Sequence, residues 1–88
     1  MCYLYLLENF DGNHRYLGST VDVDVRILEH NRGVTKATRN KGPWHIVQTW
    51  KLGSIKEVRQ VEYKLKKMKR KLSIDYVDFF VERFKTKS

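Results

Sequence analysis

An Asp-Gly pair near the N-terminus is the feature that most constrains how this chain can fold. Asp11-Gly12 is a strong hairpin-turn signal, and it lies between two β-prone stretches, residues 3–7 and residues 14–19. We therefore expect the chain to open with two antiparallel strands.

A helix is expected directly after the hairpin, over residues 21–32. Thr20 can cap its N-terminus, and Asp22 and Asp24 in the first turn favour the positive end of a helix dipole. Gly33, just past the last turn, is typical of a helix C-terminus.

The second half of the chain predicts a loop, a strand and two helices. Residues 34–43 mix basic, Thr and Gly-Pro signals of a loop, and the β-prone residues 44–50 predict a third strand. Ser54 and Glu57 fit a capping box, and Ser73 can cap a further helix. Apolar residues recur at helical spacing behind each cap: Ile55, Val58, Val61, Leu65, Met68 and Leu72, then Ile74, Val77, Phe80, Val81 and Phe84.

These elements, in the order ββαβαα, predict an α/β (α+β) fold in which helices flank a three-stranded antiparallel sheet. The 88 residues, 41% of them hydrophobic, suffice for a single domain, 1–88, without a linker. The single Cys2 cannot form an internal disulfide, and the apolar run that ends before Glu8 is too short for a signal peptide or a membrane span. A cytoplasmic location without a membrane partner is therefore expected.

Positive charge is concentrated in the middle of the chain. The formal net charge is +8, but residues 30–72 alone contain thirteen basic and two acidic residues, a local charge of +11. Such asymmetry favours a nucleic-acid partner over an acidic protein or anionic lipid. Trp44 and Trp50, expected on one face of the third strand, fit the core better than stacking on bases. Seven cations are candidates for contacting phosphates: Lys36, Arg39, Lys41, Lys64, Lys67, Arg70 and Lys71.

Glu62 falls inside the apolar arc of the second predicted helix. Burying an unpaired charge costs at least several kcal/mol, so this carboxylate should meet a cation of the protein or bind a metal ion. At the edge of the arc it can also reach water or pair with Lys66, and the pattern alone does not decide between these partners.

Arg26 and His30 lie four residues apart and therefore project from one face of the first predicted helix. A guanidinium offers a fixed fork of donors to phosphate oxygens, and an imidazole can accept a proton at neutral pH. Tyr5 and Tyr16 lie on the two strands of the predicted hairpin. A solvated helix face and ordinary strand packing are the simpler interpretations of these four residues.

Several of these residues form an ordered set of motifs. The set comprises Tyr3-Leu4-Tyr5, Tyr16-Leu17-Gly18, Arg26, His30-Asn31 and Glu62. In this order they resemble the GIY-YIG nuclease domain, and the similarity extends over residues 3–72. It includes the stretch from Thr38-Arg39 to Pro43-Trp44, which is typical of the small standalone members.

The chain departs from the family pattern at three places. Tyr3 replaces the glycine of the first triplet, a change also seen in the small-protein branch. Ser19 stands where repair nucleases have a lysine, and Ile74 lies near the place where several catalytic members have an amide. The last two departures point to altered substrate positioning or weak activity.

The resemblance implies a divalent-metal-dependent DNA endonuclease that hydrolyses phosphodiester bonds. It identifies Glu62 as the sole protein ligand of Mg²⁺ or Mn²⁺, Arg26 as the group facing the scissile phosphate, and Tyr16 as orienting water or phosphate. Tyr5 and His30 are the candidates for taking the proton of the attacking water. A phenol with an ordinary pKa near 10 is a poor base, so His30 is preferred, acting directly or through Tyr5.

Two other functions stay open. One is a nucleic-acid-binding module on the same fold with little or no turnover. The other is an interaction domain whose basic face docks an acidic protein. For a nuclease this small, specificity for a DNA structure or site is expected to come from an accessory protein or from homodimerisation.

Overall fold

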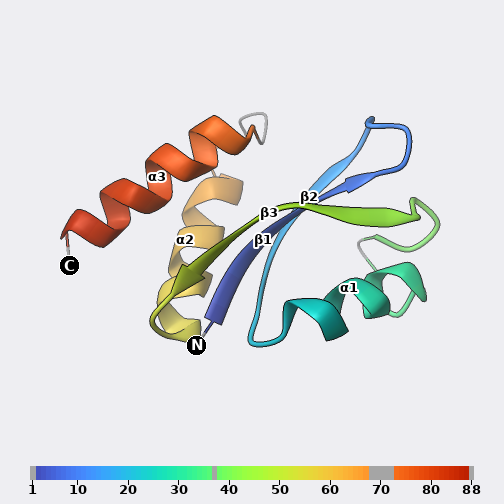
Figure 1. The fold of residues 1–88 in the computed structure, drawn as a ribbon, viewed down its shortest axis with the longest axis horizontal. Helices are drawn as coiled ribbons and strands as arrows, with labels where there is room; N and C mark the ends of the chain where they lie inside the picture. Colours follow the sequence, from blue (N-terminus) through green and yellow to red (C-terminus); the bar gives the residue numbers. More distant parts are fainter. Residues whose placement is uncertain (1, 37, 68–72, 88) are drawn as a thin grey trace.

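A three-stranded antiparallel sheet, with one helix on one face and two on the other, forms the computed structural model of this chain (Figure 1). The structure describes residues 2–36, 38–67 and 73–87. Its elements are β1 (Cys2–Asn9), β2 (Arg15–Thr20), α1 (Val23–Asn31), β3 (Trp44–Leu52), α2 (Ile55–Lys67) and α3 (Ile74–Lys87). The predicted fold class and element order are confirmed. Within the described ranges, no helix has the length and apolar composition that crossing a lipid bilayer requires.

Strand β1 lies in the centre of the sheet and pairs antiparallel with both β2 and β3. Tyr5, for example, faces Gly18 on β2 and Thr49 on β3. Because side chains alternate along a strand, Leu4 and Leu6 point to one face of the sheet and Tyr5 points to the other. All three are buried, so β1 is covered on both faces.

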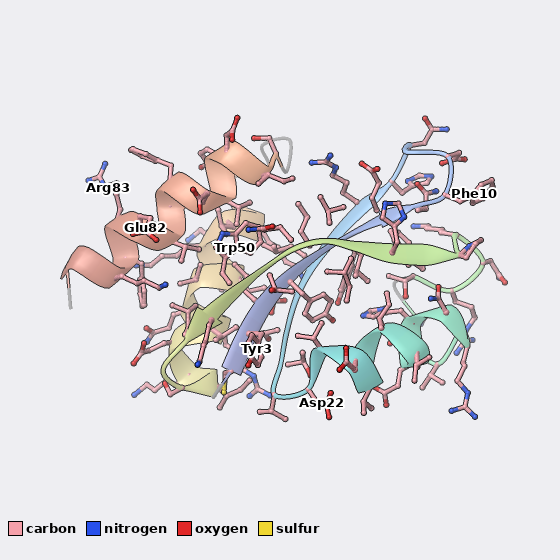
Figure 2. The ribbon with its side chains drawn as sticks, viewed as in Figure 1. Tyr3, Phe10, Asp22, Trp50, Glu82 and Arg83 are labelled. Carbon is pink, nitrogen blue, oxygen red and sulfur yellow. The ribbon has the colours of Figure 1, made fainter. Side chains whose placement is uncertain are left out.

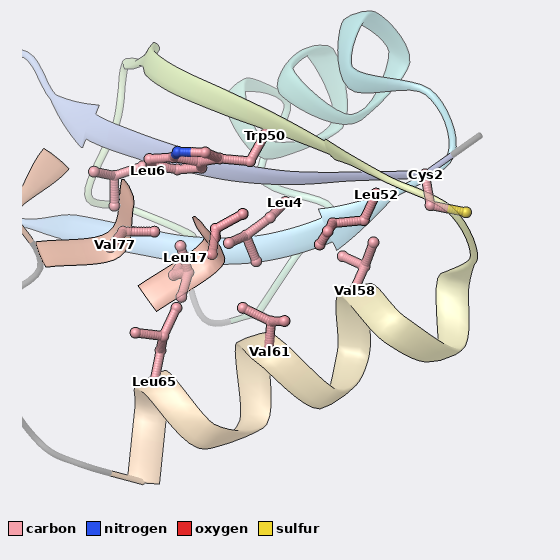
Figure 3. Packing of buried hydrophobic residues seen from close by; sticks show 11 residues of the cluster. Cys2, Leu4, Leu6, Leu17, Trp50, Leu52, Val58, Val61, Leu65 and Val77 are labelled. Atoms are coloured by element: carbon pink, nitrogen blue, oxygen red, sulfur yellow. The ribbon is translucent and has the colours of Figure 1, made fainter. Parts of the chain in front are cut away.

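The larger core lies between the sheet and helices α2 and α3 (Figure 3). Helix α2 contributes Val58, Val61 and Leu65, which are buried at the helical spacing that the sequence predicts. They pack with residues of all three strands and of α3: Cys2, Leu4, Leu6, Leu17, Trp50, Leu52, Val77 and Val81. Met68 and Leu72, predicted to continue the stripe, lie outside the described residues. This core fixes the position of α2 relative to the hairpin.

The two tryptophans of β3 lie on opposite faces of the sheet, contrary to the prediction that they share one. Strands β1 and β3 pair with a register shift of one residue, which makes Val47 an extra residue on β3. A bulge of this kind reverses the alternation of faces beyond it. Trp50 therefore packs in the larger core on the side of α3 (Figure 2), and Trp44 packs with Tyr5 on the side of α1. Both indoles are buried, as predicted.

Helix α1 begins later than predicted, because Asp22 rather than Thr20 is its N-cap. The Asp22 carboxylate accepts a hydrogen bond from the Val25 amide at 3.2 Å, and its charge is favourable at the positive end of the helix. The Thr20 hydroxyl instead accepts a bond from the Asp22 amide at 3.1 Å, which supports the turn before the helix. Ser54 and Ser73 cap α2 and α3 as predicted, each accepting a bond at 3.2 Å from the amide three residues further on.

Side-chain hydrogen bonds attach the loop between α1 and β3 to the end of α1. Asn31 accepts a bond from the Trp44 amide at 2.6 Å and donates one to the Trp44 carbonyl at 3.1 Å. Nε1 of the Trp44 indole donates in turn to the backbone carbonyl of Thr38 at 3.1 Å. Thr38 is buried as a result, next to His30 in the last turn of α1.

Replacing Asn31 by Ala should destabilise the fold, because the change removes both side-chain bonds to Trp44. We expect the free energy of unfolding to fall by about 1–3 kcal/mol. In a domain of this size the loss lowers Tm by roughly 4–20 °C. Thermal unfolding followed by circular dichroism measures the shift. Asn13→Ala, in the exposed hairpin turn, is the control, and equal Tm values for the two variants would contradict the role of Asn31.

Candidate active site

Tyr5 lies on the face of β1 that α1 covers, and its ring crosses the neighbouring strand at Gly18. The two residues are directly paired between β1 and β2. A Cβ atom at position 18 would lie 2.5 Å from Cζ of Tyr5 and against the hydroxyl oxygen, closer than side chains come to one another. Glycine at this position therefore leaves room for the Tyr5 ring to extend towards α1.

The buried Tyr5 hydroxyl is bonded to two residues of α1. It lies 2.8 Å from Nε2 of His30, and it accepts a hydrogen bond from Nε of Arg26 at 3.3 Å. Burial raises the pKa of Tyr5 to about 12, and the hydrogen bond and charge of Arg26 act in the opposite direction. Tyr5 is therefore a neutral phenol at pH 7, and an imidazole lies beside its oxygen.

His30 lies in the last turn of α1 and is only 2% exposed. Its Nε2 lies at the Tyr5 hydroxyl, and its Nδ1 is 2.7 Å from Oγ1 of Thr38. Burial first, and then the positive charge of Arg26, lower the pKa of His30 below its ordinary value of 6.5. The imidazole is therefore neutral at pH 7, with a lone pair on one of its ring nitrogens.

Arg26 projects from the same side of α1 as His30, as their spacing predicts. Its Nε donates to Tyr5, and its Nη1 donates to Oε1 of Glu29 at 3.1 Å. The hydrogen bond to Tyr5 is the main cause that raises the already high pKa of Arg26, so the guanidinium keeps its charge. With 31% of its side chain exposed, Arg26 remains accessible to a bound ligand.

A cavity of about 390 Å³ opens between the hairpin, α1 and α2. Four of the five predicted catalytic residues line it: Tyr5, Tyr16, Arg26 and Glu62. His30 lies behind Tyr5 and lines a second cavity, of about 370 Å³, on the side of the α1–β3 loop. The structure thus brings the five residues together, and His30 is connected to the first cavity through the Tyr5 hydroxyl.

Tyr16 on β2 packs beside the two buried residues. Its ring centroid lies 6.4 Å from that of Tyr5 and 5.1 Å from that of His30. Nζ of Lys66 lies 4.8 Å from the centroid of the same ring, a favourable cation–π distance. The half-buried Tyr16 ring therefore forms a wall of the first cavity, between α2 and the two buried residues Tyr5 and His30.

Glu62 lines the first cavity from α2, with 19% of its side chain exposed. Its carboxylate forms an ion pair with Lys66, one helical turn further on, at 2.8 Å. Of the partners that the apolar arc left open, the structure therefore shows a cation of the protein itself. The pairing offsets the cost of placing a carboxylate in a largely enclosed position.

Further residues line the first cavity that sequence reasoning did not assign to the site: Ser19, Arg59, Tyr63 and Lys66. Arg59 and Lys66 lie three residues before and four residues after Glu62, so they share its face of α2. Helical spacing from Glu62 was the signal that could have identified them.

Thr38, the hydrogen-bond partner of His30, was also not predicted as a site residue. No sequence signal could have identified it, because only the path of the loop brings it to His30.

The first cavity offers one carboxylate to a metal ion. Among residues 2–36, 38–67 and 73–87, no group of three or more His, Cys, Asp or Glu side chains could hold one. Mg²⁺ is usually bound by one or two carboxylates, with waters and substrate phosphates completing its coordination. Glu62 fits such an ion, because it brings carboxylate oxygens to the lining of this cavity.

The predicted phosphate-contacting cations lie on two elements. Three are exposed on the loop that borders the second cavity: Lys36, Arg39 and Lys41. Two are exposed on α2, which borders the first cavity: Lys64 and Lys67. The other two lie outside the described residues: Arg70 and Lys71.

Comparison with known proteins relates the chain to one family. Residues 1–75 match the GIY-YIG catalytic domain. A UPF0213 protein of Halalkalibacterium halodurans is 43% identical over 70 residues, which cover 78% of this chain and 73% of that protein. A UPF0213 protein of Halobacterium salinarum is 37% identical over 71 residues, or 80% and 91% of the two chains. The solution NMR structure of a UPF0213 protein from Bacillus halodurans matches 93% of this chain and 84% of that one, with 39% identity and a TM-score of 0.47. The chain belongs to the GIY-YIG family.

Proposed function

We propose that this protein is a divalent-metal-dependent endonuclease that hydrolyses phosphodiester bonds in DNA. The observation that carries the proposal is the hydrogen-bonded group of Arg26, Tyr5 and His30, next to a cavity that Glu62 lines from α2. A fixed cation and a carboxylate that line one cavity, with a proton acceptor reached through the Tyr5 hydroxyl, suit phosphodiester hydrolysis. Membership of the GIY-YIG family supports the same reaction class.

Arg26 binds the scissile phosphate and stabilises the charge that develops on it. Its bonds to Tyr5 and Glu29 hold the guanidinium in one orientation, so little rearrangement is needed during the reaction. Tyr16 and Ser19 line the same cavity from β2, and their hydroxyl groups are the ones that orient the phosphate or the attacking water.

Tyr5 and His30 act as a pair in taking the proton of the attacking water. With a pKa of about 12, Tyr5 does not lose its proton unaided at pH 7. As the water attacks, its proton moves to the Tyr5 oxygen while the Tyr5 proton moves to Nε2 of His30, 2.8 Å away. The lowered pKa of His30 keeps the imidazole neutral and ready to accept. His30 is thus the final acceptor, and it acts through Tyr5.

Glu62 is the residue that would hold the metal ion. When bound, Mg²⁺ or Mn²⁺ supplies a Lewis acid that polarises a phosphoryl oxygen and offsets its negative charge. Lys66 neutralises the carboxylate in the absence of an ion and lies beside the Tyr16 ring, so it remains close to a phosphate bound in the cavity.

DNA is the proposed substrate because basic residues border both cavities. Residues 30–72 carry a local charge of +11, and the described cations of the loop and of α2 are exposed. Contacts between such side chains and phosphates release counterions, so affinity should fall steeply with salt. These contacts position a nucleic acid without reading its bases.

A nucleic-acid-binding module with little or no turnover is the second candidate. The ion pair between Glu62 and Lys66 favours it, because Lys66 holds the carboxylate that a metal ion would need. Ser19, in place of the lysine of the repair nucleases, also lines the cavity. The two candidates differ in whether the protein cleaves DNA and whether cleavage depends on Glu62.

Replacing Glu62 by Ala should lower metal-dependent cleavage by about 100-fold or more, because the proposed metal ligand is lost. Folding and salt-dependent DNA binding should be retained. Linear and branched DNA substrates incubated with Mg²⁺ or Mn²⁺ measure cleavage, and fluorescence anisotropy measures binding. Glu82→Ala, exposed on α3, is the control. Unaltered cleavage by Glu62→Ala would reject the metal-site assignment, and binding without cleavage by the wild-type protein would support the binding module.

Replacing Arg26 by Lys should lower kcat by about 10²–10³-fold, because lysine keeps the charge but loses the fixed fork of donors. DNA affinity should change little, since the surface cations are untouched. Single-turnover cleavage and anisotropy separate the two effects. Arg32→Lys, exposed at the C-cap of α1, is the matched control. A large loss of DNA affinity with turnover retained would contradict the proposed role of Arg26 at the scissile phosphate.

The rate of cleavage should fall at acid pH with an apparent pKa below 6.5. His30 accepts a proton only while it is neutral, and burial and Arg26 lower its pKa. The neutral form therefore persists at pH 7 and is lost as the pH falls through the lowered pKa. A profile of kcat/KM against pH at constant ionic strength measures this limb, and His30→Gln should remove it together with most of the rate. An acid limb centred above pH 6.5 would contradict the assignment.

A further inference from the structure

Three buried polar side chains connect the first cavity to the α1–β3 loop. Tyr5, His30 and Thr38 are 1%, 2% and 1% exposed. His30 lies between the other two, with Nε2 2.8 Å from the Tyr5 hydroxyl and Nδ1 2.7 Å from Oγ1 of Thr38. The proposed mechanism uses Tyr5 and His30 and gives Thr38 no role.

The groups at the two ends favour one direction for these hydrogen bonds. The Arg26 guanidinium is only a donor, so the Tyr5 oxygen accepts from it, and the Tyr5 O–H is available to donate to Nε2 of His30, 2.8 Å away. At the other end, Oγ1 of Thr38 lies 3.5 Å from the backbone carbonyl of Thr35, which can only accept. A Thr38 O–H directed at that carbonyl leaves Oγ1 free to accept from Nδ1–H of His30, 2.7 Å away.

The backbone of Thr38 is held so that its hydroxyl has a defined position. Its amide donates to the Thr35 carbonyl at 3.2 Å, and its own carbonyl accepts from the Lys41 amide at 3.3 Å and from Nε1 of Trp44 at 3.1 Å. Trp44 is in turn bonded to Asn31, next to His30 in the chain. The loop therefore presents one hydroxyl to the imidazole in a fixed geometry.

We propose that Thr38 is a positioning residue that holds His30 in the Nδ1–H tautomer, with the lone pair of Nε2 directed at the proton of Tyr5. The opposite tautomer would point an N–H group at the Tyr5 oxygen and, with no lone pair on Nε2, could not take its proton. The hydrogen bond at Nδ1 matters because the bond at one ring nitrogen sets the state of the other. The consequence for cleavage rests on the proposed function, but the tautomer is a property of the folded protein alone.

Thr38 also accommodates the product of the proton transfer. The bond between Nε2 and the proton forms as the Tyr5 O–H bond breaks, and the resulting imidazolium carries a proton on both ring nitrogens. Oγ1 of Thr38 can accept from Nδ1–H in both states of the ring, and the bond strengthens when the ring is charged. His30 can therefore gain and release the proton without turning.

Nuclear magnetic resonance tests the tautomer directly, in protein without metal or DNA. The chain has three histidines, and replacing the exposed His14 and His45 by Gln leaves His30 as the single imidazole. In long-range ¹H–¹⁵N spectra above pH 7, Nδ1 of His30 is expected to be the protonated nitrogen and Nε2 the unprotonated one. A proton on Nε2 would overturn the proposal, whether or not the protein cleaves DNA.

Two variants separate the hydroxyl of Thr38 from its shape. Thr38→Val keeps the volume but has no acceptor, so the Nδ1–H tautomer should give way to Nε2–H or to a mixture, and kcat should fall about 10- to 100-fold with KM unchanged. Thr38→Ser keeps the hydroxyl, so the tautomer should be retained and kcat should stay close to the wild-type value. Thermal unfolding reports whether each variant is folded.

The outcomes distinguish this proposal from the proposed function. A folded Thr38→Val variant with an unchanged tautomer would overturn the role of Thr38. If that variant does not fold, the tautomer of the His14→Gln/His45→Gln protein, with and without Thr38→Ser, decides instead. A protein that cleaves no DNA but has the expected tautomer would refute the proposed function and support the assignment to Thr38. Cleavage by a protein whose His30 is protonated at Nε2 would refute that assignment alone.

Discussion

Strand β1 is paired along both edges and covered on both faces, and the chemistry of the site follows from this constraint. A polar group on such a strand has to find its partners inside the protein. The Tyr5 hydroxyl finds them in His30 and Arg26. The same enclosure raises the pKa of Tyr5 and lowers that of His30, so both stay neutral beside the fixed charge of Arg26. The site therefore places a protonated phenol beside a neutral imidazole, 2.8 Å apart.

The sheet separates the apolar residues of the larger core from those of the candidate site, and α2 contributes to both. One face of the sheet packs into the larger apolar core with α2 and α3. The other face carries Tyr5 and Trp44 against α1. On α2, Val61 is buried in the core while its neighbour Glu62 lines the first cavity. The packing of the apolar core thus determines where the carboxylate lies relative to the tyrosines.

Local patterns in the sequence were sufficient for the hairpin, for the helix caps at Ser54 and Ser73 and for the buried stripe of α2, because each depends on neighbours within a few residues. The N-cap of α1 was placed wrongly, since Thr20 and Asp22 both suit a cap and only the path of the chain out of β2 selects Asp22. The same-face prediction for the tryptophans failed because a bulge depends on pairing with β1.

The order of the motifs predicted that Tyr5, Tyr16, Arg26 and Glu62 share one site, and these four residues line one cavity. The partners of these residues, however, depend on tertiary structure. Whether Glu62 would meet water, a lysine or an ion could not be decided from helical spacing. Thr38 was outside the reach of any periodic pattern, because it lies in an irregular loop whose course depends on the bonds between Asn31 and Trp44.

The extra residue at Val47 bears on how the length of β3 is compared between family members. In a regular strand, side chains six residues apart point to the same face of the sheet. Trp44 and Trp50 point to opposite faces only because Val47 is left out of the regular pairing with β1. A strand one residue shorter would reach the same two layers through unbroken pairing. In an alignment, a single gap between Trp44 and Trp50 is therefore best interpreted as loss of the bulge, with both aromatic rings still inserted where they are in this chain.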